Sequence, residues 1–165
     1  MKPKLLLFYL FISLCLISCD DENDTGSIDF DEDEFVENLN NWNQLNLQNY
    51  SYEYSNSGCS GTGMSSDIGI EMVNGEVESA VALVENGIQG SEKYLIDDLF
   101  AEIRSTYEEN EGLESTSDAY LEEIEVIYNE EYFYPEEVRY IYHIPEGYDG
   151  LWNFYQYITN FEPTN

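Results

Sequence analysis

Residues 92–110, EKYLIDDLFAEIRSTYEEN, place their apolar side chains three or four positions apart. This spacing puts those side chains on one face of an α-helix. The face consists of Leu95, Ile96, Leu99, Phe100, Ile103 and Tyr107. Segments with the pattern of β-strands lie on both sides of this helix, so the sequence predicts a helix inserted between two groups of strands.

The upstream group of strands begins with an alternating pattern. Tyr50, Tyr52 and Tyr54 alternate with polar residues, which is the period of a strand that buries one face. Residues 55–66, SNSGCSGTGMSS, are predicted to form a loop. Residues 67–84, DIGIEMVNGEVESAVALV, predict a hairpin with its turn at Asn74-Gly75, because both residue types tolerate the positive φ angles of a two-residue turn.

The downstream group consists of three more strands, and another helix precedes the whole pattern. The strands are predicted at residues 120–128, 136–144 and 152–161, with breaks at Tyr134-Pro135 and at residues 145–147. The N-terminal helix follows Asp29 and has the apolar face Phe35, Leu39, Trp42 and Leu45. The predicted fold is α+β, with an antiparallel sheet of five to six strands, two helices packed on one face and the order α-β-β-β-α-β-β-β.

The first residues have the layout of a secretory signal. Lys2 and Lys4 precede an apolar run over residues 5–17, which is shorter than the roughly 20 residues that a membrane-spanning helix needs. The segment Leu16-Ile17-Ser18-Cys19 resembles the lipobox of bacterial lipoprotein precursors. That resemblance implies cleavage before Cys19 and attachment of lipid, including palmitate, to this residue. The alternatives are an ordinary signal peptide with an incidental cysteine and an uncleaved anchor.

Three parts of the chain follow from this layout. Residues 1–18 are the predicted signal peptide, residues 19–28 an acidic tether and residues 29–165 a single domain. Several acyl chains would hold the protein on a membrane, since each buried methylene contributes about 0.8 kcal/mol. The acids after Cys19 resemble an export signal of surface lipoproteins, so we expect an outer-membrane location, on either the surface or the periplasmic face.

The charge balance limits the partners that this chain can bind. The formal net charge is −30, and Lys93, Arg104 and Arg139 are the basic residues beyond the signal segment. This balance argues against nucleic acid, whose binding depends on Lys and Arg, and it attracts cations and basic proteins. The alternative is that the charge serves solubility alone. A hydrophobic content of 42% still supplies a core.

No catalytic, metal or cofactor site is predicted. After removal of the signal segment, Cys59 is the one cysteine left in addition to the lipidated Cys19, so it is free or pairs with another chain. His143 is the one candidate for a catalytic partner of Cys59. Asp29, Asp31 and Asp33 begin like an EF-hand loop, but Glu34 and Asn40 occupy the positions that need Gly and Glu. Loose binding of calcium to the acidic surface remains an alternative. The sequence therefore predicts a protein that is not an enzyme.

The aromatic residues of the last strands are the candidate binding surface. Alternation along residues 152–161 places Trp152, Phe154 and Ile158 on one face and Tyr155, Tyr157 and Phe161 on the other. If helices cover one face, some of these rings stay exposed, where they suit sugar stacking or protein contact. The candidate surface residues are Tyr155, Tyr157 and Tyr142, and burial of the same rings in a core is the alternative.

Short motifs along the chain resemble a family of bacterial lipoproteins of unknown function. They are Tyr50-Ser51-Tyr52, Asn74-Gly75-Glu76-Val77, Ile96-Asp97-Asp98-Leu99-Phe100, Ile127-Tyr128-Asn129 and Tyr134-Pro135. Three positions depart from the family pattern: Leu95 stands for a capping Thr, Asn129 for an Asp and Phe133 for a Gly. Cys59 stands alone where relatives have paired cysteines. The resemblance implies the fold and an envelope location, and it implies no activity.

Two functions are thus expected, in order. The first is a lipid-anchored, non-catalytic protein-interaction or accessory module of the cell envelope. The alternative is a ligand-binding lipoprotein that takes a glycan on an aromatic sheet face or calcium on its surface acids.

Overall fold

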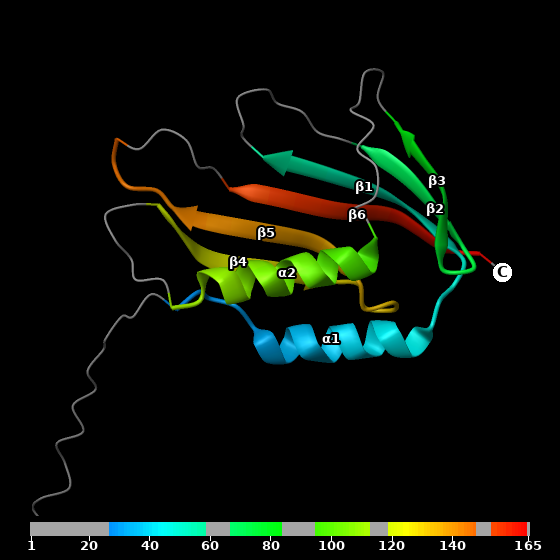
Figure 1. Ribbon diagram of the computed structural model, residues 1–165, viewed down its shortest axis with the longest axis horizontal. Coiled ribbons are helices and arrows are strands. Elements are labelled where there is room, and N and C mark those ends of the chain that lie inside the picture. Colours follow the sequence, from blue (N-terminus) through cyan, green and yellow to red (C-terminus); the bar gives the residue numbers. More distant parts are fainter. Residues whose placement is uncertain (1–26, 59–66, 84–94, 113–118, 148–152, 165) are drawn as a thin grey trace, which may run out of the picture.

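The α+β prediction is confirmed. The computed structural model describes residues 27–58, 67–83, 95–112, 119–147 and 153–164. These residues form one six-stranded antiparallel sheet and two helices, in the predicted order (Figure 1). The elements are α1 (Glu32–Leu45), β1 (Tyr50–Gly58), β2 (Ile68–Val73), β3 (Glu76–Ala82), α2 (Ile96–Asn110), β4 (Tyr120–Tyr128), β5 (Pro135–His143) and β6 (Phe154–Pro163).

The first and last strands of the chain meet in the middle of the sheet. The strand order is β3-β2-β1-β6-β5-β4, so each group of three strands keeps its sequence neighbours and the two groups join through β1 and β6. Their pairing runs from Tyr50 opposite Pro163 to Gly58 opposite Phe154. The sheet is therefore continuous only when the C-terminal strand is in place.

The predicted hairpin is confirmed, whereas part of the loop prediction is wrong. Asn74 and Gly75 both have positive φ angles, 54° and 77°, and join β2 to β3. Residues 55–58, predicted as loop, extend β1 because they pair with residues 154–157 of β6. Serine and glycine have little preference for strands, so the partner strand decides their conformation. The rest of that predicted loop, including Cys59, lies outside the described residues.

The first helix begins at a side-chain cap. The backbone N–H of Glu34 donates to Oδ1 of Asp31 at 2.9 Å, and the first turn is acidic, which suits the positive end of a helix dipole. Phe35 and Trp42 are buried as predicted. Leu45 was expected on the same face but is 37% exposed, since the helix ends there and Asn46 turns the chain with a φ angle of 46°.

The second helix lacks such a cap. Leu95 precedes it and makes no capping hydrogen bond, because its side chain has no polar atom. The residues Ile96, Leu99, Phe100 and Ile103 are buried, so the predicted face is confirmed for them. Burial of this face compensates for the missing cap, because helices in proteins depend more on packing than on local signals.

Both helices cover the same face of the sheet (Figure 1). The indole Nε1 of Trp42 in α1 donates to Oδ1 of Asp97 in α2 at 2.7 Å. The Trp42 ring also meets Tyr50 of β1 edge to face, with centroids 5.6 Å apart. On α2, Glu102 accepts from Nε2 of Gln156 at 3.2 Å, so β6 lies under the second helix. Asp97 therefore joins the two helices in addition to its favourable place in the first turn of α2.

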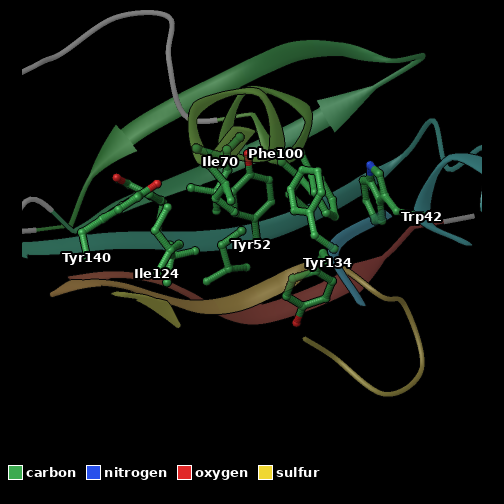
Figure 2. Packing of buried hydrophobic residues seen from close by; sticks show 14 of the residues in the cluster. Trp42, Tyr52, Ile70, Phe100, Ile124, Tyr134 and Tyr140 are labelled. Atoms are coloured by element: carbon green, nitrogen blue, oxygen red, sulfur yellow. The ribbon is translucent and has the colours of Figure 1, made fainter. Parts of the chain in front are cut away.

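The core fills the layer between the helices and the sheet. Figure 2 shows side chains from both helices and the strands in this layer, among them Tyr52, Phe100 and Trp42. Ile28 is buried too, and Asp29 forms a parallel bridge with Glu123 of β4. Ile28 was assigned to the tether, so the folded part includes at least this one residue more than expected.

Candidate functional site: a groove beside the helix-free face

The face of the sheet opposite the helices carries two of the three predicted surface tyrosines. Tyr155 pairs with Arg139 and Tyr157 pairs with Glu137 across β6 and β5. Paired residues point to the same side, and the neighbouring Val138 and Gln156 are buried under the helices. Tyr155 and Tyr157 are half-buried and therefore lie on the surface that we call the helix-free face.

Tyr142 does not join them. It stands two positions after the buried Tyr140, so it points to the helix side, where it packs against the edge of the core. Its backbone N–H donates to Oδ1 of Asn153 at 3.1 Å. The three predicted surface residues thus divide between two faces. Trp152 lies outside the described residues.

The alternation expected for the last strand is wrong for Phe161. It was placed with Tyr155 and Tyr157, but its ring lies 4.6 Å from that of Tyr134, centroid to centroid, within the buried aromatic layer. The cause is a β-bulge: between Ser51 and Glu53 the pairing with β6 moves by three residues instead of two. Asn160 takes the positive φ angle of 53° at this bulge, and the side chains after it change faces.

A groove of about 660 Å³ opens where β5 and β6 separate. The last residue pair between the two strands is Glu137 with Tyr157, and beyond it the bulge of β6 faces the turn before β5. The lining of the groove combines acids, amides, tyrosine rings and aliphatic groups. The lining residues are Ile127, Asn129, Glu131, Tyr132, Tyr134, Glu136, Glu137, Tyr157, Ile158, Thr159, Asn160 and Phe161.

Asn129 shapes the turn that forms one wall of the groove. Its Oδ1 accepts the backbone N–H groups of Glu131 and Tyr132 at 3.0 and 2.8 Å, which is a local side-chain turn. Its Nδ2 donates to Glu136 at 2.8 Å. Phe133 has a φ angle of 64°, in the left-handed region that favours glycine, which gives a physical reason for the Gly expected there.

The electrostatics of the groove are acidic. Arg139 binds Glu137 at 2.7 Å and Glu125 at 2.8 Å, and these hydrogen bonds raise the pKa of its guanidinium. A hydrogen bond to Glu131 raises the pKa of Tyr132, and burial raises that of Tyr134. Arg139 is thus occupied by its own neighbours, and the groove presents an excess of oxygen acceptors.

The acids at the N-terminus form a separate and smaller cavity. It measures about 170 Å³, and its lining includes Asp29, Asp31, Glu34, Glu123 and Glu125. Within the described ranges no group of three or more His, Cys, Asp or Glu side chains is placed to hold a metal ion. Asp31 caps α1, so its place in the Asp29, Asp31, Asp33 pattern has a structural explanation.

Sequence reasoning missed most of the groove. Asn129, Thr159 and Asn160 were not proposed as site residues, because their role depends on a turn and a bulge that bring distant segments together. Tyr132 was not proposed either, although it begins a run of three aromatic residues, Tyr132-Phe133-Tyr134, which could have drawn attention to this segment. The predicted lipidation residue Cys19 lies outside the part of the chain that the structure describes, and no helix in the described part is long and apolar enough to cross a membrane.

These features define an α+β domain that covers one sheet face with two helices and holds an acidic, aromatic groove beside the other face. The chain belongs to a family of unknown function (DUF6174), whose model matches residues 34–144. No curated protein and no solved structure matches the chain. The matched residues end before β6, the strand that joins the two halves of the sheet.

Proposed function

We propose that this protein is a non-catalytic interaction module whose groove binds basic side chains of a partner protein. The observation that carries the proposal is the composition of the groove, where Glu131, Glu136 and Glu137 lie with the rings of Tyr132 and Tyr157. Carboxylates attract Lys and Arg, and a tyrosine ring attracts a cation to its face. The net charge of −30 would speed the encounter with a basic partner.

The hydrogen bonds that the groove acids make suit a binding role. Glu136 accepts from Asn129, and Glu137 accepts from Arg139. These hydrogen bonds fix the orientation of both carboxylates on the lining of the groove, where each retains lone pairs that can accept from the N–H groups of a basic side chain.

We expect a lysine- and arginine-rich peptide to bind the folded domain and to lose binding when the groove is altered. Tyr157→Ala removes a ring from the lining, and Glu131→Gln removes one negative charge. Each change is expected to weaken binding about five- to thirtyfold, the range of a cation–π contact or a charge-assisted hydrogen bond. Fluorescence anisotropy with a labelled peptide measures the effect.

Tyr155→Ala is the matched control. Tyr155 lies two positions away on the same strand and the same face, but it does not line the groove. Its removal should leave the affinity within about twofold. Equal losses for Tyr155→Ala and Tyr157→Ala would place binding on the open sheet instead, and no binding of the basic peptide would contradict the proposal.

Glycan binding is the second candidate. The groove also contains the amides of Asn129 and Asn160, the hydroxyl of Thr159 and three tyrosine rings, groups that recognise sugars by hydrogen bonds and stacking. Neutral oligosaccharides are therefore titrated in the same assay. Binding of a neutral oligosaccharide that is lost in Tyr157→Ala but unchanged in Glu131→Gln would favour this candidate over the first.

The envelope location is part of the same proposal. The lipobox-like segment supports lipidation of Cys19 and attachment to the outer membrane, on its surface or its periplasmic face. In cells grown with labelled palmitate, Cys19→Ser is expected to abolish both labelling and membrane retention. Cys59→Ser is the matched control and should retain both. Labelled Cys19→Ser protein would exclude this residue as the lipid site.

A further inference from the structure

The two edges of the sheet differ in how their backbone is protected. At the β4 edge, Asp29 takes the place of a neighbouring strand: its N–H donates to the Glu122 carbonyl at 2.9 Å, and its carbonyl accepts the Ile124 N–H at 2.9 Å. At the β3 edge, no strand among the described residues pairs with the outer side. Figure 1 shows β3 at one end of the sheet, away from both helices.

The register identifies the backbone groups that point outward from β3. The Leu83 N–H donates to the Asp67 carbonyl at 2.8 Å, so this pair is hydrogen-bonded. Hydrogen-bonded and non-hydrogen-bonded pairs alternate in an antiparallel ladder. Ala82 and Ala80 stand opposite Ile68 and Ile70 and form the non-hydrogen-bonded pairs, so their backbone groups make no hydrogen bonds to β2. Their N–H and C=O groups point away from the sheet.

The side chains of this edge do not block another strand. Val81 and Leu83 are 59% and 50% exposed, and Ser79 and Ala80 are small. Natural sheets commonly protect an open edge with charged side chains, proline, a β-bulge or a covering segment. The described β2–β3 hairpin contains neither lysine nor proline, and its β-bulge and the acids of β3 lie near the turn, between residues 71 and 78. The part of β3 from Ser79 to Ala82 therefore retains the features of a strand that accepts a partner.

Charge decides which partner fits. Glu76 and Glu78 lie in β3, Glu71 lies on the adjacent strand, and residues 67–83 contain no Lys or Arg. A second copy would bring the same acids and a net charge of −30 against them. We infer that β3 accepts an extended, Lys- or Arg-bearing segment of a partner protein as an additional strand, through main-chain hydrogen bonds to Ala80 and Ala82. This surface is separate from the groove.

Ala80→Pro tests the inference with little expected damage to the hairpin. Proline removes the outward N–H of residue 80 and costs no hydrogen bond to β2, which is the edge position where strands tolerate proline. The probe is a labelled peptide that alternates valine with lysine, titrated onto the full chain and followed by anisotropy. We expect Ala80→Pro to weaken binding at least tenfold, whereas Ala80→Ser, the matched control, stays within about twofold.

A change in the probe tests the same hydrogen bonds without changing the protein. The peptide with N-methylated backbone at alternate residues is expected to bind at least tenfold more weakly, and a version with glutamate in place of lysine should not bind. Equal binding of the N-methylated and ordinary peptides would overturn the inference, as would failure of the lysine peptide to bind. Self-association of the wild-type chain that Ala80→Pro abolishes would also overturn it, by making a second copy the occupant.

Discussion

Raising the pH from about 9 to about 12 is expected to unfold the domain in one cooperative transition. Burial raises the pKa of Tyr50 from 10.0 to about 12, and burial likewise raises the pKa values of Tyr52, Tyr134 and Tyr140. All four side chains are at most 4% exposed. The folded state therefore keeps tyrosine protons that the unfolded chain releases.

The sign of the effect follows from the number of bound protons. Below pH 10 both states hold the tyrosine protons, and the stability is unaffected by them. Above pH 10 the unfolded chain holds fewer protons, so the free energy of unfolding decreases as the pH rises. Each tyrosine contributes a slope of about 1.4 kcal/mol per pH unit. Four tyrosines together lower the free energy of unfolding by about 5 kcal/mol for each pH unit, which is comparable with the total stability of a small domain.

Two signals recorded on the same samples measure this transition. Tyrosinate absorbance in the near ultraviolet reports ionisation of the tyrosines, and far-ultraviolet circular dichroism reports the fold. The absorbance that comes from the buried tyrosines is expected to rise over the same pH range in which the circular dichroism signal of the fold is lost. Tyr50→Phe should make the fall in stability above pH 10 shallower by about 1.4 kcal/mol per unit. Full ionisation of the tyrosines while the fold persists would contradict the prediction.

Phe100→Ala is expected to destabilise the domain by about 3–5 kcal/mol. Phe100 is 2% exposed and stands between the two layers of the fold. Its ring meets Phe35 of α1 at 5.8 Å and stacks on Tyr128 of β4 at 6.4 Å, centroid to centroid. The substitution leaves a cavity that α1, α2 and the sheet share, and such a loss is a large part of a stability of about 5–15 kcal/mol.

Urea unfolding followed by circular dichroism measures this loss. Val36→Ala is the matched control, because Val36 lies on α1 next to Phe35 but is 45% exposed, and it should change the stability by less than about 0.5 kcal/mol. Phe100→Leu fills part of the cavity and remains measurable if the alanine variant does not fold. A leucine variant less stable than the alanine variant would show that volume does not control this site.

The elements with strong local patterns were predictable from sequence. Tyr50, Tyr52 and Tyr54 are buried as their alternation predicted, and Asn74-Gly75 forms the expected turn. The helix around Phe100 buries the face that its spacing indicated. In each case the periodicity of the side chains directly reflects which face meets the core, so local sequence is sufficient.

The groove was not predictable in the same way. Alternation placed Phe161 beside Tyr157, and the bulge at Asn160 placed it in the core instead. The polar residues 55–58 had the composition of a loop, and they became a strand because β6 lies beside them. A bulge and a long-range strand pair both depend on the partner strand, which no local pattern contains.

The sequence by itself determined the element types, their order, the acidic surface and the choice of an α+β fold, because these depend on side-chain spacing and composition. The tertiary structure alone decided that β1 meets β6 at the centre, that Tyr142 lies apart from Tyr155 and Tyr157, and that the groove opens beyond Glu137. The last two of these features depend on how β5 pairs with β6. The first arises from contacts between residues about a hundred positions apart, such as the hydrogen bond from Gln156 to Tyr54. Their geometry is fixed only when the two halves of the sheet join.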